Sequence, residues 1–97
     1  MAIDRQLVIQ ALTEYVRHLE QGAANTTRAE LRPQYRDRLA QAARLFAALS
    51  DPRPDWEKVR TIVTDEERAI GWSYLPGGNG AEAESAFVRV RKLVRED

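Results

Sequence analysis

The sequence contains a single histidine, His18, which follows Glu14 by one helical turn. This spacing would let the two side chains share a proton or supply two ligands to one metal ion. A metal site usually needs three or four ligands, and without cysteine or a second histidine the others would have to be carboxylates. We therefore interpret His18 as an exposed helical histidine beside a glutamate, and we predict no metal site.

A run of three acidic residues, Asp65, Glu66 and Glu67, is the second group that could do chemistry. Paired carboxylates can exchange protons or bind a hard cation, but consecutive residues on a helix point in different directions. Acidic residues in a first helical turn also stabilise the helix by complementing its dipole. We favour this structural role, together with a secondary role as an exposed acidic patch for a basic partner.

The glycine-rich segment 77–80 precedes a predicted helix, which is the general arrangement that binds phosphate. It matches neither GxGxxG nor a P-loop with its lysine, and Glu82 and Glu84 in the following turn would repel an anion. No serine lies in a nucleophile elbow, and the sequence offers no set of serine, histidine and aspartate for catalysis. We therefore predict a protein that is not an enzyme, with no catalytic residue and no cofactor.

Large aromatic residues are concentrated where protein interfaces have most of their binding energy. Trp72 and Tyr74 lie where helical periodicity fails, beside the glycine-rich segment, so we expect both to contact a protein partner. Trp56 has helical spacing to later apolar residues and is expected in the core. The predicted partner-binding residues are Trp72, Tyr74, Asp65, Glu66, Glu67 and Val88.

Two basic groups leave further functions open. Val88 falls among Arg91, Lys92 and Arg95 on a helical wheel, so it could contact a partner or a second copy of the chain. Residues 28–44 include five arginines, whose planar side chains suit phosphates and carboxylates. The nearby tyrosine lies on a predicted core face, so stacking on bases is not indicated. We favour a solvated face for this segment, and docking to an acidic partner is its main alternative.

Composition narrows the class of protein. The chain has 97 residues, which fits a single domain spanning residues 1–97, and it contains no cysteine, so packing must stabilise it. Fifteen basic and fifteen acidic side chains leave no net charge, which argues against nucleic acid as the partner. No secretion signal and no stretch of roughly 20 apolar residues is present, so we expect a cytoplasmic protein that does not enter a membrane.

Apolar residues at three- and four-residue steps predict the helices that position these side chains. The first helix is expected to begin after Asp4 as N-cap and to end near Gly22. The second covers residues 35–49. Pro33 predicts that residues 27–32 form a separate turn or a kinked first turn of that helix.

A third helix is expected to start at Trp56. Thr64 has the spacing of a capping box, which predicts either a short fourth helix through Ile70 or a bent continuation of the third. The final helix is predicted over residues 81–95. Residues 87–91 also alternate between apolar and polar as a strand would, but the length of the segment favours a helix.

The predicted fold is all-α, an antiparallel bundle of four to five helices. The apolar stripes of the first, second and last helices are expected to bury against one another in a shared core, and the third and fourth pieces are expected to cap one end. The residues expected to line that core are Val8, Ala11, Leu12, Tyr15, Val16, Leu19, Tyr35, Leu39, Ala42, Phe46, Leu49, Trp56, Val59, Ile62, Val63, Ala83, Ala86, Phe87, Val90 and Val94.

Three features of this layout belong together: the opening Ile3-Asp4-Arg5 of an amphipathic helix, the long second helix Tyr35–Leu49, and the passage through Ala69-Ile70-Gly71 to a last helix. In element order the chain resembles small all-helical bacterial immunity proteins, especially those that guard against NAD-degrading effectors of type VI secretion. The resemblance implies a cytoplasmic protein that binds a toxin domain and occludes its active site.

The leading hypothesis is thus a non-catalytic protein-binding module of the immunity type. One alternative is a homo-oligomeric structural or regulatory protein, such as a homodimer, that self-associates through Val88 and its neighbours. The other is a nucleic-acid-binding protein that uses the arginine-rich second helix.

Overall fold

The computed structural model describes the backbone of residues 3–70 and 78–95, and the side chains of residues 3–65 and 81–95. The described residues form α1 (Arg5–Asn25), the short 3₁₀ helix η1 (Ala29–Leu31), α2 (Arg32–Leu49), α3 (Trp56–Ile70) and α4 (Gly78–Arg95). Because no strand occurs among them, the prediction of an all-α fold is confirmed.

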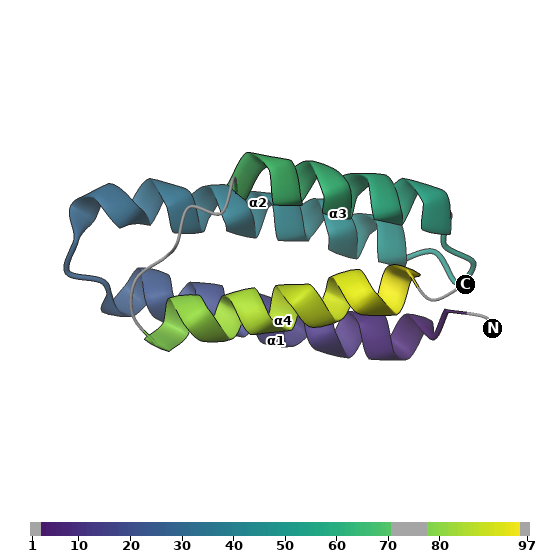
Figure 1. Ribbon diagram of the computed structural model, residues 1–97, viewed down its shortest axis with the longest axis horizontal. Coiled ribbons are helices and arrows are strands. Elements are labelled where there is room, and N and C mark those ends of the chain that lie inside the picture. Colours follow the sequence, from purple (N-terminus) through teal and green to yellow (C-terminus); the bar gives the residue numbers. More distant parts are fainter. Residues whose placement is uncertain (1–2, 71–77, 96–97) are drawn as a thin grey trace.

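The four α-helices lie side by side along the long axis of the molecule, which measures 42 × 21 × 19 Å, and successive helices run in opposite directions (Figure 1). Helix α1 packs against both α4 and α2, and its contact with α4 is the most extensive between any two helices. Helix α3 lies along α2 and packs more extensively against it than against α4, so the prediction that the third and fourth pieces cap one end was wrong (Figure 1). We call the line where α3 meets α4 the α3–α4 seam; this contact is less extensive than those of α1 with α4, of α1 with α2 and of α2 with α3.

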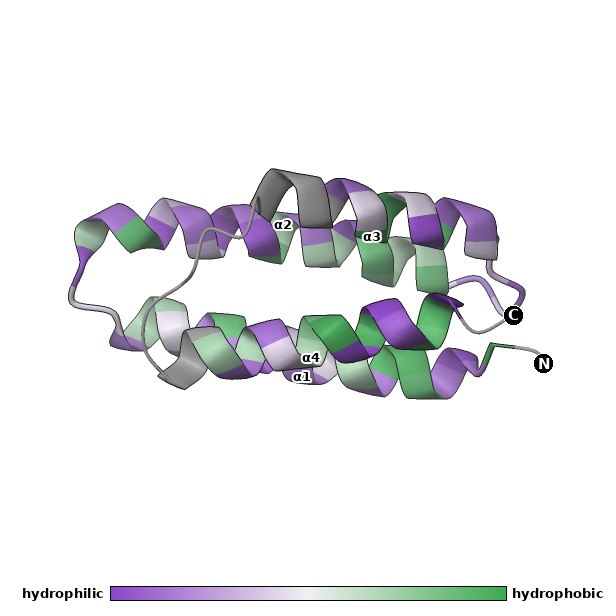
Figure 2. Ribbon diagram, in the orientation of Figure 1, coloured by the Kyte–Doolittle hydropathy of each residue, from purple (hydrophilic) through white to green (hydrophobic). Residues whose placement is uncertain are grey.

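The core forms where the helices face one another, and each helix carries apolar residues on one side and polar residues on the other (Figure 2). On α1 and α4 nearly all the predicted core residues are buried, and the rings of Tyr15 and Phe87 join the two helices with centroids 5.3 Å apart. The buried side chains of the core are Val8, Ala11, Leu12, Tyr15, Leu19, Leu31, Tyr35, Ala42, Leu45, Leu49, Val59, Ile62, Val63, Ala83, Ala86, Phe87, Val90 and Val94.

The predicted core face of α2 is confirmed at Tyr35, Ala42 and Leu49 but differs at two positions. Leu39 and Phe46 are only half-buried, whereas Leu45 and Arg38 are buried in their place. Helix α2 contacts both α1 and α3, so its buried face is centred between these two neighbours rather than on the apolar stripe itself. Val16 of α1 is likewise only half-buried, at the outer edge of its helix.

The predicted end of the first helix near Gly22 was also wrong. Helix α1 continues to Asn25, and the backbone N–H of Thr26 then donates to the Gly22 carbonyl at 2.9 Å. A Cβ atom placed on Gly22 would lie 2.5 Å from Cζ of Tyr35. The glycine is thus suited to this position because the Tyr35 ring packs directly against the α1 backbone there.

The connections around α2 and α3 follow local signals. The separate turn predicted near residues 27–32 is confirmed as η1, and Pro33 falls in the first turn of α2, where its missing N–H costs no hydrogen bond. A backbone hydrogen bond and then the side chain of Arg28 lower the pKa of Glu30 in this turn. Asp55 accepts hydrogen bonds from the N–H groups of residues 57 and 58, at 3.1 and 3.2 Å, at the start of α3.

No separate fourth helix begins at Thr64. Its hydroxyl donates to the Arg60 carbonyl one turn earlier, at 2.9 Å, inside a continuous α3 that extends to Ile70. Residues 87–91 lie within α4, so the helical prediction for them is confirmed and the strand alternative is wrong. In the parts of the chain that the structure describes, no helix has both the length and the apolar character needed to cross a membrane.

Two arginines join chain segments at the end of the molecule where α1 begins. Arg5 Nε donates to the Leu49 carbonyl at 2.7 Å, which links the start of α1 to the end of α2. Arg60 donates to the Val94 carbonyl at 3.3 Å, which links α3 to the end of α4. Carbonyls in a last helical turn lack partners within the helix, so both arginines satisfy groups that the helices leave open.

Substitution of Arg5 by alanine is expected to lower the free energy of unfolding by about 1–2 kcal/mol, because the Leu49 carbonyl loses a charged donor in a partly buried place. Urea denaturation followed by circular dichroism measures the change. The matched control is Arg17→Ala on the exposed side of α1, expected to stay within about 0.5 kcal/mol of the unchanged chain. Equal effects of the two substitutions would contradict a specific role for Arg5.

Candidate functional site

Much of the predicted partner-binding set lies outside what the structure describes. Trp72 and Tyr74 lie outside the described residues altogether. Glu66 and Glu67 belong to α3, but their side chains are outside the described set. Asp65 is exposed, in the second half of α3 rather than in a first helical turn, so the dipole argument made for this acidic run does not apply.

His18 and Glu14 were expected to lie beside each other on an exposed face, but each has its partner on α4. His18 is only 24 % exposed, and its Nδ1 lies 2.9 Å from Oε2 of Glu82. The two atoms are close but poorly aligned for a hydrogen bond. Glu14 accepts a hydrogen bond from Arg89 at 2.8 Å, and both of these side chains are about half exposed.

These two pairs border an open groove of about 380 Å³ between α1 and α4. An exposed ion pair such as that of Arg89 with Glu14 contributes at most about 1 kcal/mol, so it adds little to the stability of the fold. Within residues 3–65 and 81–95, no three or more His, Cys, Asp or Glu side chains are grouped so that they could hold a metal ion.

The five arginines of residues 28–44 do not form one surface. Arg38 is buried on the inner side of α2, with only 8 % of the residue exposed. Arg28 precedes η1 and pairs with Glu30 at 2.9 Å, and Arg44 donates to Gln41 at 2.9 Å. Arg32 and Arg36 are exposed as well, so four of the five arginines are exposed as predicted and Arg38 is the exception.

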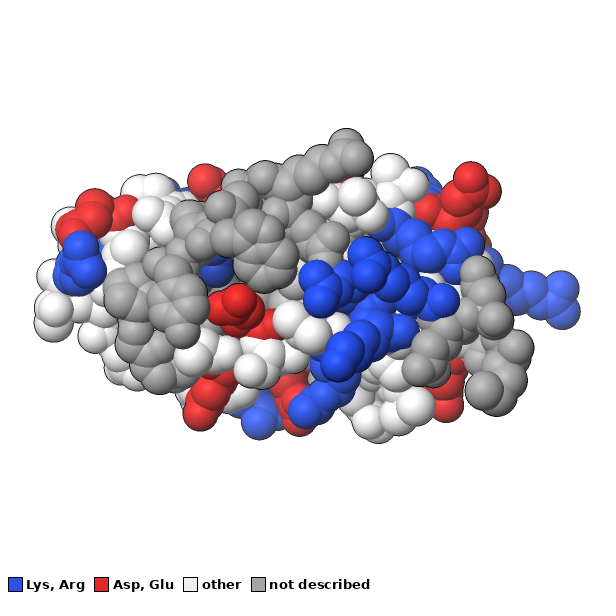
Figure 3. All heavy atoms as spheres, in the orientation of Figure 1, with Lys and Arg blue, Asp and Glu red and all other residues white. Residues whose placement is uncertain are grey.

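A basic surface does form where α4 ends. Around the half-buried Val88, helix α4 places Arg91, Lys92 and Arg95 on one side, as the helical wheel predicts. The structure adds Arg60 from α3, across the α3–α4 seam. We call the residues Arg60, Arg91, Lys92 and Arg95 the basic face; in Figure 3 blue side chains gather over this part of the seam.

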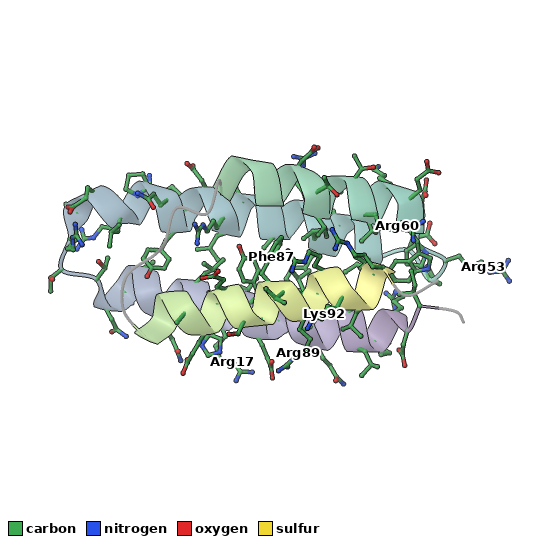
Figure 4. All side chains as sticks on the ribbon, in the orientation of Figure 1. Arg17, Arg53, Arg60, Phe87, Arg89 and Lys92 are labelled. Carbon is green, nitrogen blue, oxygen red and sulfur yellow. The ribbon has the colours of Figure 1, made fainter. Side chains whose placement is uncertain are left out.

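Three arginines of the basic face line a small hollow in the α3–α4 seam, with a volume of about 70 Å³. Its lining residues are Arg60, Val63, Thr64, Arg91, Val94 and Arg95. Val63 and Val94 are buried, so the hollow has an apolar base and a cationic rim. Figure 4 places Arg60 at α3 and Lys92 on α4.

Part of this charge has a structural use. Lys92 and Arg95 stand in the last turn of α4, where cations complement the helix dipole. Arg60 belongs to the middle of α3, and its hydrogen bond to the Val94 carbonyl gives it a similar use at the end of α4. Sequence reasoning found the α4 residues by their spacing, but it missed Arg60, because only the packing of α3 against α4 brings that residue to them.

Comparison of the chain with protein-family models, with curated proteins and with solved structures gave no match. What the described residues define is an all-helical protein with a basic face across two helices.

Proposed function

We propose that the chain is a non-catalytic protein-binding module, an antiparallel bundle of helices that acts by covering a surface of another protein. The single observation that carries this proposal is the basic face, in which Arg91, Lys92 and Arg95 follow the half-buried Val88 along α4 and Arg60 joins them across the α3–α4 seam. Arginine is enriched in protein interfaces, and a partly buried apolar residue among cations supplies apolar area that a partner can cover.

The dimensions of the surface support a macromolecular partner. Sites for small molecules usually have volumes of about 300–1,000 Å³ and enclose most of their ligand. The hollow at the basic face has a volume of about 70 Å³, and the groove beside His18 is larger but open. A basic face with so small a hollow is better suited to many weak contacts with a protein than to enclosing a metabolite.

Charge favours a different protein as the partner over a second copy of the chain. In a two-fold symmetric contact centred on Val88, the basic face of one copy would meet the same face of the other. Glu84, one turn before Val88, would bring one carboxylate into that contact. This single negative charge is outnumbered by the three cations Arg91, Lys92 and Arg95. An acidic partner removes this repulsion, so a homodimer is the weaker candidate.

A more specific version of this proposal is that the chain is an inhibitor of one particular partner. The resemblance in element order to immunity proteins suggests a bacterial toxin domain whose active site the chain occludes in the cytoplasm. The contact then has further candidate residues. These are Trp72 and Tyr74, because of their residue type, and Asp65, Glu66 and Glu67, because of their charge. The product of the reading frame beside the gene is the first partner to test.

Co-expression of the chain with that neighbouring product tests the proposal. We expect a complex that survives size-exclusion chromatography, and we expect Val88→Glu to weaken it at least about tenfold, since a carboxylate would then face the acidic partner. The melting temperature should change little, because Val88 is only partly buried. The same assay applied to Trp72→Ala and Tyr74→Ala shows whether these aromatics take part.

The matched control is Leu7→Glu, which places the same charge on an exposed apolar residue of α1. It should leave the complex intact. Equal binding by the unchanged chain and the Val88→Glu variant would contradict the proposed surface, and turnover of a small molecule by the purified chain would contradict the proposed class.

A further inference from the structure

We infer that the hollow in the α3–α4 seam receives a carboxylate from a short acidic segment of the partner protein. This inference rests on the proposed function and names the chemistry of the partner. It is carried by the convergence of Arg60, Arg91 and Arg95, from two helices, on one small cavity.

The cavity has the dimensions of a single functional group. Its volume of about 70 Å³ is well below the roughly 300–1,000 Å³ of sites that enclose a whole small molecule. A space of this size suits a small group such as a carboxylate. The apolar base formed by Val63 and Val94 lowers the local dielectric, so the attraction between an entering anion and the rim is stronger than in open solvent.

The donors on the rim are of the right kind. Each guanidinium has five N–H donors in a plane, so an arginine that already makes one hydrogen bond still has the geometry to bind a carboxylate through two others. Arg60 is held in place by its bond to the Val94 carbonyl at 3.3 Å. Its own carbonyl accepts from Thr64 at 2.9 Å, which ties Thr64 to the same turn of α3.

The extent of the basic face points to a protein segment instead of a nucleic acid. On α4 the cations of the basic face occupy only residues 91–95, and Glu84 lies one turn before Val88. A nucleic-acid strand that continued along the helix would meet this carboxylate, whereas a short acidic peptide ends before it. The described residues of the face include no exposed aromatic ring on which a base could stack.

Fluorescence anisotropy with a labelled oligoglutamate of about ten residues tests the inference on the full chain at low ionic strength, about 50 mM, where surface charges are weakly screened. We expect saturable binding that weakens as salt is added. Arg91→Gln should weaken it roughly tenfold, since a charged hydrogen-bond donor is lost. Arg91→Lys keeps the charge but loses the planar guanidinium group. Its affinity for oligoglutamate should therefore lie between that of the unchanged chain and that of Arg91→Gln.

The matched control is Arg36→Gln, which removes the same charge from an exposed position on α2 outside the hollow. It should leave oligoglutamate binding unchanged. Circular dichroism verifies the fold of each variant, and the exposed Arg95→Gln replaces Arg91→Gln if the latter does not fold.

Three results would overturn the inference: no binding of oligoglutamate at low salt, an equal loss in Arg36→Gln, or tighter binding of a single-stranded DNA of the same length through the same arginines. The two proposals fail separately. If the co-expressed partner depends on Val88 but is unaffected by the Arg91 and Arg95 substitutions, the protein-binding function stands and the carboxylate site does not.

Discussion

Replacement of Phe87 by alanine is expected to lower the free energy of unfolding by about 3–5 kcal/mol. Phe87 is 5 % exposed and lies in the contact between α1 and α4, the most extensive in the molecule. The substitution removes the ring that packs against Tyr15 and leaves a cavity that the two helices cannot close without moving. Urea denaturation at equilibrium measures the difference.

Two further substitutions make this result interpretable. Phe87→Leu keeps most of the apolar volume and should cost clearly less than alanine, since volume-conserving exchanges in a core usually cost below about 1.5 kcal/mol. Leu7→Ala removes apolar atoms from a residue that is 46 % exposed, so its effect should be small. A loss below about 1 kcal/mol for Phe87→Ala would mean that α1 and α4 do not share a close-packed core.

Replacement of Gly22 by alanine is expected to destabilise the protein by about 1–2 kcal/mol, although helix propensity alone predicts a gain of about 1 kcal/mol. Gly22 lies inside α1, and a Cβ atom there would overlap the ring of Tyr35, which is buried and has little space to move. The cost of displacing that ring exceeds the benefit of a better helix former. Thermal or urea unfolding decides the sign.

The control for Gly22→Ala is Ala24→Gly, an exposed position in the same part of α1, where glycine should cost about 0.5–1 kcal/mol from propensity alone. A double substitution with Tyr35→Leu tests the cause: without the ring, alanine at residue 22 should be much less harmful, and the two effects should not add. If Gly22→Ala stabilised the protein, the close approach of α1 and α2 at Tyr35 would be refuted.

The candidate site shows how separate parts of the chain contribute to one surface. Three of its cations are close in sequence and share one side of α4, whereas Arg60 comes from α3. The hollow needs both helices, so any change in the packing of α3 against α4 should alter binding even where no cation is removed. Variants within the basic face should for this reason be paired with measurements of stability.

The buried faces of α1 and α4 could be read from the sequence, because apolar residues with a period of 3.6 must lie on one side of a helix. The N-cap at Asp4 could be read in the same way, and its carboxylate accepts hydrogen bonds from the N–H groups of residues 6 and 7, at 3.0 and 3.3 Å. The grouping of cations near Val88 could also be read from the sequence. These features depend on residues within one or two turns of each other, so local geometry determines them.

Tertiary packing decided the rest. The rotation of α2 that buries Arg38 and Leu45, the need for glycine at residue 22 and the addition of Arg60 to the α4 cations all depend on contacts between helices that are distant in the chain. A helical period gives the direction of an apolar face to within about one residue, but it carries no information on how far one helix is shifted or rotated against another. Only the complementary shapes of the assembled side chains determine that register.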